Sequence, residues 1–318
     1  MPPFAVALAD IQQAAQRLAG RAHRTPVMTC ATLDRMSGRS LFFKCEQFQK
    51  VGAFKFRGAC NAVLRLAPEV AARGVATHSS GNHAQALALA AAQRGIPAHI
   101  VMPKNASPVK RRAVERYGGR VVECEPTLEA RETTAAAVLA ETGATMIPPY
   151  NHPDVIAGQG TTALELLEQV PQLDAVVVPV GGGGLMAGVT IAAKAMAPDT
   201  RIFAAEPAGA DDAARSKAAG KLIPQTEPRT IADGLRTSLG DLTWPVLRDQ
   251  VERVLTVTDE EIIASMRLAW ERAKLLIETS SAVAVAAVLG DAFRSLEGLQ
   301  RVGVVLSGGN VNLDDLPW

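Results

Sequence analysis

The sequence predicts an α/β protein in about two domains. Strand patterns rich in valine and isoleucine alternate with helical patterns along most of the chain, which is the rhythm of βαβ units. Of the 318 residues, 48% are apolar and 20% are charged, as in ordinary soluble α/β proteins. A chain of this length has room for about two domains of roughly 150 residues each.

The first half of the chain carries a leading helix and four strand and helix units. Ile11, Ala14, Ala15 and Leu18 follow helical spacing after Asp10, a candidate N-cap. Apolar runs predict strands at residues 40–46, 74–79, 98–103 and 120–124, and helical patterns follow at 54–66, 81–95, 107–119 and up to about Thr142. The third of these helices begins with Ser107 and Pro108 in capping positions and closes on Gly118.

The second half continues the alternation. Helices are predicted at residues 155–169, directly after the glycines 181–184 and around 259–277, and strands at 175–180, 201–206 and 301–307. The proline-rich stretch 148–153 is the best candidate for a crossing between domains.

Charge and hydropathy exclude several classes of protein. Thirty-three basic residues against thirty-two acidic ones give a net charge of +1, so we expect no nucleic-acid partner. The opening MPPFAVALAD has no basic leader, and no stretch reaches the roughly eighteen apolar residues of a membrane span, so we expect a cytoplasmic protein with no membrane partner. Cys30, Cys45, Cys60 and Cys124 show no CxxC or metal spacing, which predicts reduced and mostly buried thiols.

Four consecutive glycines, residues 181–184, follow the strand at 175–180. Glycine in a regular element costs about 0.5 to 1 kcal/mol relative to alanine, so a compensating contact is expected. A strand that turns through glycines into a helix presents free N–H groups and the positive end of a helix dipole, which together bind a phosphate. The alternative is a tight packed turn, which would need only one or two of the glycines.

Two cofactors fit such a turn. Gly182, Gly184 and Ala187 satisfy G-x-G-x-x-A, and Glu206 ends the next strand at a suitable distance, as in dinucleotide-binding proteins. That pattern alone would favour a nicotinamide-dependent oxidoreductase. It leaves three other groups of residues unexplained.

These groups carry reactive or polar side chains beside predicted element ends. Lys55 lies between two phenylalanines at a helix start, an environment that favours the neutral amine needed to form an imine. The stretch SSGNHAQA, residues 79–86, offers donors to a carboxylate at a helix start, and Ser307 ends a strand before two glycines. The alternatives are a surface lysine and an ordinary capped helix.

Taken together, these stretches resemble the fold type II pyridoxal phosphate enzymes, and most closely the group of serine racemase, threonine dehydratase and 3-hydroxyaspartate dehydratase. The likeness runs in order through RTPV, FKCEQFQK, HSSGNHAQAL, VIAGQGT, VVPVGGGG, AAEPAGADD, TIADG and VLSGGNV. It implies a two-domain, tryptophan synthase β-like fold in which each domain is an open, twisted, mostly parallel sheet flanked by helices. The large cofactor domain would comprise residues 1–72 and 147–318, and the small domain residues 73–146.

The resemblance also implies roles for the cofactor residues. Lys55 resembles the lysine that holds the cofactor as an imine, and Phe54 the residue beside the pyridine ring. The phosphate cradle is matched by Gly181, Gly182, Gly183 and Gly184, the partner of the ring hydroxyl by Asn82, and the partner of the pyridine nitrogen by Ser307. A neutral hydroxyl leaves that nitrogen largely unprotonated, which suits elimination at Cβ more than transamination. Ala53 replaces the serine of many relatives and affects only fine tuning.

The reaction implied is that of an ammonia-lyase. Lys55 would remove the Cα proton, while Ser79, Asn82 and His83 hold the α-carboxylate. Ser80 resembles the acid or base on the opposite face. The expected substrate is 3-hydroxyaspartate, with L-serine and L-threonine slower, and the products are a 2-oxo acid and ammonia. A serine or aspartate racemase is the alternative.

Further residues match more specialised sites. Arg131 and Thr237, with His78 nearby in sequence, correspond to positions that could meet a second carboxylate, although Arg131 could equally be an exposed helix residue.

The segment AAEPAGADD resembles the divalent-cation site of the group, with Glu206 and Asp212 as carboxylate ligands and Ala210 through its carbonyl. Mg²⁺, Ca²⁺ or Mn²⁺ would suit these oxygens, and a solvated acidic loop is the alternative. The resemblance further implies a homodimer and a possible adenine nucleotide effector at Lys50, Gln85 and Tyr117.

Overall fold

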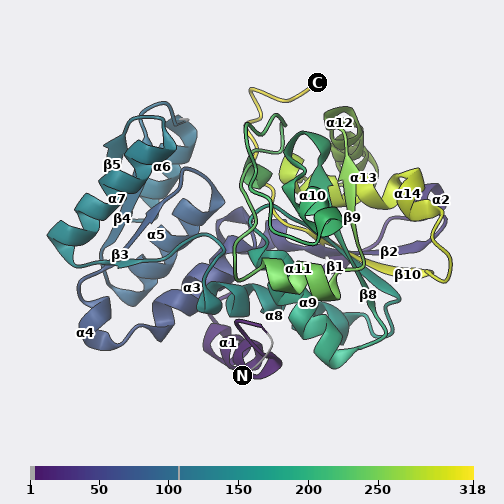
Figure 1. Ribbon diagram of the computed structural model, residues 1–318, viewed down its shortest axis with the longest axis horizontal. Coiled ribbons are helices and arrows are strands. Elements are labelled where there is room, and N and C mark those ends of the chain that lie inside the picture. The colour runs from purple at the N-terminus through teal and green to yellow at the C-terminus, as the bar shows by residue number, and fades with distance from the viewer. Residues whose placement is uncertain (1–3, 107) are drawn as a thin grey trace.

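The computed structural model describes residues 4–106 and 108–318 (Figure 1). Two sheets organise the chain. The larger has the strand order β1 (Val27–Met28), β2 (Ser40–Cys45), β10 (Arg301–Leu306), β7 (Ala175–Pro179), β8 (Arg201–Pro207), β9 (Arg253–Val257), and the smaller β5 (Arg120–Cys124), β4 (Ala98–Pro103), β3 (Val75–His78), β6 (Thr145–Met146). Neighbouring strands are parallel except β1 with β2. The predicted α/β class with mostly parallel sheets is confirmed.

Helices cover both sheets. They are α1 (Leu8–Leu18), α2 (Ala31–Ser37), α3 (Lys55–Arg65), α4 (Pro68–Ala71), α5 (Asn82–Arg94), α6 (Pro108–Arg116), α7 (Leu128–Thr142), α8 (Pro153–Gln169), α9 (Gly184–Met196), α10 (Asp212–Ala219), α11 (Trp244–Gln250), α12 (Asp259–Leu268), α13 (Thr279–Leu289) and α14 (Asp291–Arg294). In Figure 1 the smaller sheet with α5, α6 and α7 lies on the left and the larger sheet on the right. Helix α3 packs against both α5 and α8 and so joins the two parts.

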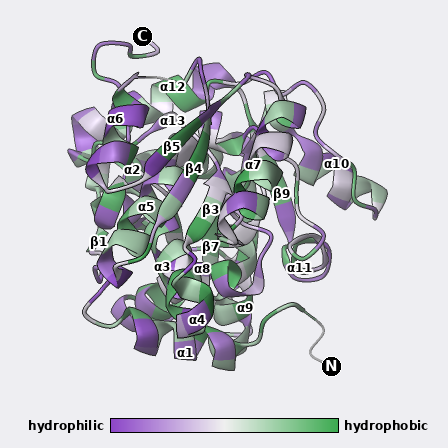
Figure 2. Ribbon diagram, turned by 90° about the vertical axis from the view of Figure 1, so that its left-hand side faces the viewer, coloured by the Kyte–Doolittle hydropathy of each residue, from purple (hydrophilic) through white to green (hydrophobic). Residues whose placement is uncertain are grey.

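The core of the larger sheet follows the alternation of side chains along its strands. On β7, Val176 and Val178 join a cluster with α1, α8 and α9, while Val177 joins the opposite cluster with α12 and α13. Since both faces are covered by helices, the central strands are apolar throughout, as parallel sheets require. Figure 2 shows the hydrophobic residues gathered toward the centre and hydrophilic ones on the outward sides of helices.

Several expectations from the sequence need correction. Asp10 is not the N-cap of α1. The N-cap is Ala7, three residues earlier, and the Asp10 carboxylate accepts a hydrogen bond from the N–H of Ala7 at 2.8 Å. The helix expected at 259–277 ends as α12 at Leu268, continues as a π-helical turn at Ala269–Ala273, and is broken at Lys274, whose φ is 59°. The predicted cap Ser107 lies outside the described residues.

Other expectations have mixed outcomes. The four cysteines are free and buried, as predicted. Within the described residues no helix is both long and apolar enough to cross a membrane. The domain boundaries at residues 72 and 146 stay a prediction. Sequence reasoning passed over short elements such as β1 and β9 and helices α10, α11 and α13.

Candidate active site

A cavity of about 270 Å³ brings together residues from both sheets. It lies where β3, β7 and β10 end, because His78, Pro179 and Ser307 line it. In parallel α/β sheets, ligands bind at this carboxyl edge. The predicted catalytic, cofactor and substrate residues that line it are Phe54, Lys55, Ser79, Ser80, Asn82, His83, Arg131, Gly181, Gly182, Gly183, Gly184, Thr237 and Ser307. Their individual roles stay predictions.

Lys55 is the first residue of α3, and the turn before it is bound to the turn after β10. The N–H of Phe54 donates to the Ser307 carbonyl at 3.0 Å, and the N–H of Gly309 donates to the Gly52 carbonyl at 2.9 Å. The Lys55 amine donates to the carbonyl of Pro149 at 2.8 Å. Burial lowers the pKa of this amine to about 8, against the opposing attraction of Glu278. This shift is in the direction expected from the sequence, toward the neutral amine.

The same turn contains a strained residue. Val51 has a φ of 57°, a conformation that β-branched residues rarely adopt. Its carbonyl accepts a hydrogen bond from the side-chain amide of Asn310 at 2.7 Å. This bond holds the turn in the shape that delivers Lys55 to the cavity.

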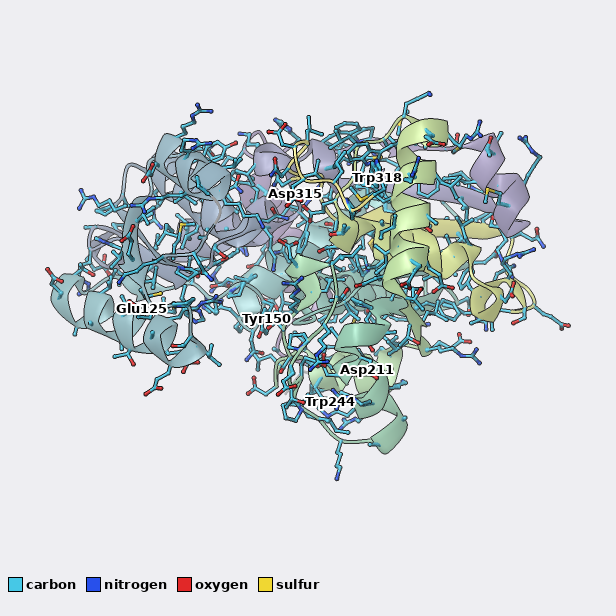
Figure 3. The ribbon with its side chains drawn as sticks, turned by 90° about the horizontal axis from the view of Figure 1, so that it is seen from above. Glu125, Tyr150, Asp211, Trp244, Asp315 and Trp318 are labelled. Atoms are coloured by element: carbon cyan, nitrogen blue, oxygen red, sulfur yellow. The ribbon has the colours of Figure 1, made fainter. Side chains whose placement is uncertain are left out.

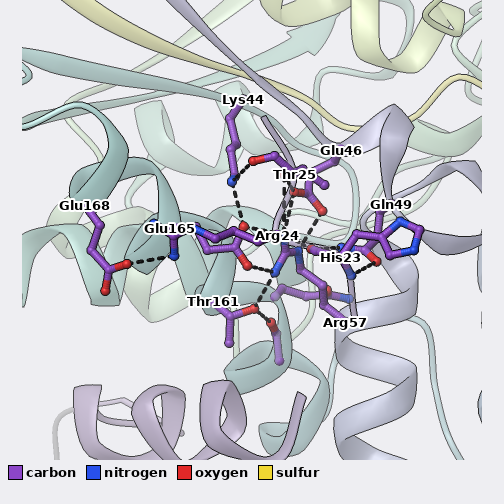
Figure 4. A network of polar contacts seen from close by, with 12 residues as sticks. His23, Arg24, Thr25, Lys44, Glu46, Gln49, Arg57, Thr161, Glu165 and Glu168 are labelled. Atoms are coloured by element: carbon purple, nitrogen blue, oxygen red, sulfur yellow. Dashed lines mark hydrogen bonds and ion pairs between the residues drawn. The ribbon is translucent and has the colours of Figure 1, made fainter. Parts of the chain in front are cut away.

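Helix α3 is anchored on its far side by a buried ion network (Figure 4). Arg57 is 1% exposed, and its guanidinium contacts the carboxylates of Glu46 and Glu165 at 2.7 Å each. Lys44 pairs with Glu165 at 2.6 Å. Because each charge has a partner, the network fixes the position of the helix that begins at Lys55 without leaving an unpaired buried ion.

The four glycines pack closely against other residues, and their backbone N–H groups point to no acceptor among the described residues. A Cβ on Gly182 would overlap the ring of Tyr150, and one on Gly184 would come within 2.9 Å of Tyr150 Cα. Gly183 has a φ of 84°, which also requires glycine. No hydrogen bond among the described residues uses the N–H groups of residues 181–184. The packed-turn alternative thus accounts for the missing side chains, while the N–H groups remain available to a phosphate.

The turn before α5 supplies polar groups from the smaller sheet. Ser79, Ser80, Asn82 and His83 all line the cavity. His83 donates from Nε2 to the Ile147 carbonyl at 2.8 Å, and its buried Nδ1 has no partner within the described residues. Burial, followed by the charge of Lys55, lowers its pKa to about 3. A neutral ring whose only N–H is already engaged cannot donate to a carboxylate, so only the backbone N–H of His83 can serve there.

Glu278 is a cavity residue that sequence reasoning missed. It is 7% exposed and accepts hydrogen bonds from the Asn82 amide at 2.9 Å and from the N–H of Asn310 at 3.0 Å. The Asn310 amide in turn donates to the Asn82 carbonyl oxygen at 2.9 Å. Burial, and then the charge of Asp233, raise the pKa of Glu278 to about 7. The sequence does contain a signal for Glu278: it is an acidic residue that ends an apolar run and stands at the start of the helix in ETSSA.

Arg131 and Thr237 face the cavity from opposite parts of the chain, α7 and the loop after residue 235. The buried Nε of Arg131 has no hydrogen-bond partner among the described residues. Lys110 of α6 and Asp233 also line the cavity and form an ion pair at 2.6 Å that connects the two parts. Neither member of that pair was singled out from the sequence.

The predicted cation ligands lie away from the cavity. Glu206 and Asp212 are 1% and 2% exposed, and Glu206 accepts from the N–H of Ala214, while Asp212 accepts from that of Leu239 at 2.9 Å. Burial raises the pKa of Glu206 to about 8 and that of Asp212 to about 6. Two buried carboxylates that form no ion pair with the described basic residues fit a cation. Within the described residues no group of three or more His, Cys, Asp or Glu side chains is arranged for a metal.

The cavity fits pyridoxal phosphate on three counts. A buried amine of lowered pKa, a glycine turn with unused N–H groups and the hydroxyl of Ser307 converge on it. The predicted nucleotide residues Lys50, Gln85 and Tyr117 do not line it. A single phosphate group suits this arrangement, and Glu206 is engaged elsewhere with the start of α10.

Comparison with known proteins agrees with this description. Residues 18–308 match the model of the family described as "Pyridoxal-phosphate dependent enzyme". A serine racemase of Arabidopsis thaliana is 56% identical over 98% of this chain and 96% of its own length. A beta-hydroxyaspartate dehydratase of Paracoccus denitrificans (strain Pd 1222) is 50% identical over 97% of this chain and 98% of its own. The solved structure of maize serine racemase has a TM-score of 0.97 at 51% identity and covers 98% of this chain and 95% of that one.

Proposed function

Because this chain belongs to the pyridoxal-phosphate dependent enzymes, we propose that it is an ammonia-lyase acting on β-hydroxy amino acids. The preferred substrate would be 3-hydroxyaspartate, with L-serine and L-threonine slower, and the products a 2-oxo acid and ammonia. The nicotinamide alternative is set aside, since the matching family binds a different cofactor. The relative named as a beta-hydroxyaspartate dehydratase supports elimination.

The cofactor, once bound, acts as an electron sink for negative charge at Cα. Lys55 would hold it covalently, the N–H groups of residues 181–184 would bind its phosphate, and Asn82 and Ser307 would meet its ring. Phe54 would pack beside that ring. Glu278 and Asn310 fix the Asn82 side chain at the cavity, because its amide nitrogen donates to both carboxylate oxygens of Glu278 at 2.9 and 3.2 Å and its oxygen accepts from the Asn310 amide.

The substrate α-carboxylate would bind at the start of α5. The hydroxyl of Ser79, the side chain of Asn82 and the backbone N–H of His83 are donors there, and the helix dipole favours an anion. With the carboxylate fixed, Lys55 would take the Cα proton as general base. Its pKa of about 8 leaves a useful neutral fraction near neutral pH.

Racemisation is the second candidate activity. Ser80 lines the same cavity as Lys55, and a proton returned from the opposite face of Cα would invert the configuration. Relatives named as serine racemases, including the one at 56% identity, favour this activity at least as much as they favour elimination. The two activities would then share the removal of the Cα proton. They would differ in the following step, which is loss of the β-hydroxyl in elimination and return of a proton to the opposite face of Cα in racemisation.

Arg131 is the observation on which the substrate assignment depends. Arg131 lines the cavity, and its buried Nε has no hydrogen-bond partner among the residues that the structure describes, an arrangement that costs free energy unless an anion binds there. A guanidinium binds a carboxylate through two parallel hydrogen bonds. The β-carboxylate of 3-hydroxyaspartate supplies such a group, whereas L-serine does not.

The test is a combined assay of keto acid and D-amino acid from 3-hydroxyaspartate, L-serine and L-threonine. Arg131→Ala should lower kcat/KM for hydroxyaspartate by about tenfold or more and leave L-serine little changed, since a charged hydrogen bond contributes about 1.5 to 3 kcal/mol. Arg116→Ala, which removes an exposed arginine from α6, is the control. Equal turnover of hydroxyaspartate by the Arg131 variant would refute the substrate assignment.

Three further features are part of the proposal. Glu206, Asp212 and the carbonyl of Ala210 would bind Mg²⁺, Ca²⁺ or Mn²⁺, so one of these ions should raise the melting temperature of the wild type and not that of Glu206→Gln. A homodimer and an effect of adenine nucleotides at Lys50, Gln85 and Tyr117 remain predictions from resemblance, as does a cytoplasmic location.

A further inference from the structure

Tyr150 is a cavity residue that no part of the proposed mechanism uses. Its ring covers Gly182, and its Cα and Cβ lie against Gly184, so that a side chain at either glycine would overlap Tyr150. The preceding residue, Pro149, accepts the hydrogen bond of the Lys55 amine at 2.8 Å. Tyr150 therefore lies between the base and the phosphate turn. Figure 3 shows it in the middle of the molecule, between the part that carries Glu125 and the part that carries Asp211.

The hydroxyl of Tyr150 is held in a defined place. It forms a hydrogen bond with the hydroxyl of Thr237 at 2.9 Å. The next residue, Asn151, binds the same loop, because its side-chain oxygen accepts from the N–H of Leu242 at 3.0 Å. Both contacts fix the phenol against the cavity wall, and Thr237 also lines the cavity.

The two hydroxyls have hydrogen-bonding capacity left over. Each carries one proton and two lone pairs, and their mutual bond uses one proton and one lone pair. One O–H group and several acceptor positions therefore remain for a ligand. A small oxygen substituent can accept that proton, whereas a methyl group cannot.

We propose that the Tyr150 and Thr237 hydroxyls form a specificity pair that binds the oxygen on Cβ of the substrate. The inference rests on the proposed function, because it assumes that the Cα–H bond faces Lys55. Cβ is one bond from Cα, so its oxygen falls on the wall that adjoins the Lys55 amine. Thr237 is then assigned to the β-hydroxyl in concert with Tyr150, while Arg131 keeps the distal carboxylate.

The test uses Tyr150→Phe, which removes the hydroxyl and keeps the ring over the glycines. Exchange of the Cα proton for deuterium is followed by NMR for L-serine and L-alanine, which differ only in the β-oxygen. The variant should lose about tenfold in kcat/KM for L-serine exchange, as for one net hydrogen bond, and less than about twofold for L-alanine. Its affinity for pyridoxal phosphate should not change.

A second variant tests the pairing. Thr237→Val should reproduce the selective loss, and the double variant should lose no more than the larger single loss, since both changes remove the same interaction. Thr226→Val, an exposed threonine of the same segment, is the control. Equal losses for L-serine and L-alanine, additive losses in the double variant, or weaker cofactor binding by Tyr150→Phe would each overturn the proposal.

The exchange measurement also separates this proposal from the proposed function. Proton exchange needs no elimination. If the wild type releases no ammonia from any β-hydroxy amino acid, the lyase assignment fails, while the comparison of L-serine with L-alanine still decides whether Tyr150 and Thr237 recognise the β-oxygen.

Discussion

Lys55 obtains its altered basicity from its surroundings, since the amine is enclosed at the start of α3 and the nearest opposite charge, Glu278, only partly offsets the lost hydration. At a pKa of about 8, roughly a tenth of these amines are neutral at pH 7, against fewer than about one in a thousand for an ordinary lysine. An amine of this kind reacts with an aldehyde at neutral pH.

The pH dependence of cofactor binding tests this value. Cofactor-free enzyme mixed with pyridoxal phosphate should recover its visible absorption at a rate that rises with pH and levels off above about pH 8. Stopped-flow absorbance measures the rate. Lys55→Ala should show no such recovery. A rate that continues to rise toward the pKa of an ordinary lysine would contradict the prediction.

The raised pKa of Glu278 predicts that the stability of the folded protein falls as the pH rises. Its pKa is raised from 4.5 to about 7 in the folded protein, so the folded state binds more protons than the unfolded state between these values. Stability from this group is complete below about pH 4.5 and is lost as the pH rises through about 7, a change on the order of 3 kcal/mol.

Glu278→Gln isolates that contribution. The variant cannot ionise, so the melting temperature of the cofactor-free wild type should fall relative to that of the variant as the pH rises from about 4.5 to 7. The variant should also bind the cofactor less well, because Asn82 and Asn310 donate to different oxygens of Glu278 and glutamine replaces one of these acceptors by an NH₂ donor. If the melting temperatures of the two proteins change with pH in parallel across this range, Glu278 does not titrate as inferred.

At the scale of elements, the sequence was informative wherever periodicity was long and regular. The bounds of α5, α8, β7 and β10 agree with expectation within a few residues because each is a continuous apolar or amphipathic run, and the helix expected to end near Thr142 ends there as α7. The prediction of one helix over 259–277 was wrong because Trp270 and Leu275 continue the apolar pattern across the break at Lys274, and both pack against the same core cluster.

Contacts between distant elements could not be predicted from local patterns. Tyr150 and Thr237 are 87 residues apart, and Asn82 and Glu278 are 196 apart, so no periodicity links them. Motif residues such as Lys55 and Ser307 were found because each ends or begins an element. Glu278, Tyr150 and Asn310 owe their place in the site to packing, which only the folded chain reveals.

Close packing of helices α8 and α9 gives an element-scale prediction. A Cβ on Gly188 of α9 would collide with the Ile156 carbonyl and the Gly160 nitrogen of α8, and backbone atoms cannot rotate aside. Alanine gains about 1 kcal/mol in helix propensity, but overpacking costs about 1 to 3 kcal/mol or more. The clash with backbone puts the cost at the upper end.

Gly188→Ala should therefore lower the free energy of unfolding by about 2 kcal/mol and weaken cofactor binding, because α9 begins at the glycine turn. Denaturant titration and cofactor absorbance measure the two effects. The control is Gly290→Ala, where an added Cβ meets its nearest atom at 3.4 Å. If Gly188→Ala is as stable as the wild type, the two helices are less tightly packed than described.

At the scale of the whole molecule, the cavity depends on how the two sheets meet. The smaller sheet contributes Ser79, Asn82 and Arg131, and the larger contributes the glycine turn and Ser307. Helix α3 packs against both parts, while the ion pair of Lys110 with Asp233 connects them at the cavity. Substrate affinity should therefore respond to contacts that contribute little to stability.

The ion pair of Lys110 with Asp233 allows an effect on substrate affinity to be measured apart from an effect on stability. Its side chains are 36% and 50% exposed, so breaking it should cost only about 0 to 1 kcal/mol of stability. Asp233→Asn should leave the melting temperature nearly unchanged yet raise KM, because the smaller sheet loses a tie that keeps its carboxylate donors facing the cavity. In the wild type, added salt should also raise KM, because salt weakens exposed ion pairs, and the variant, which lacks the pair, should respond less. Glu125→Gln, which breaks the exposed pair with Lys104 within the smaller part, is the matched control and should change neither quantity. A KM for Asp233→Asn equal to that of the wild type at low salt would mean that the packing of α3 alone sets the relation of the two sheets.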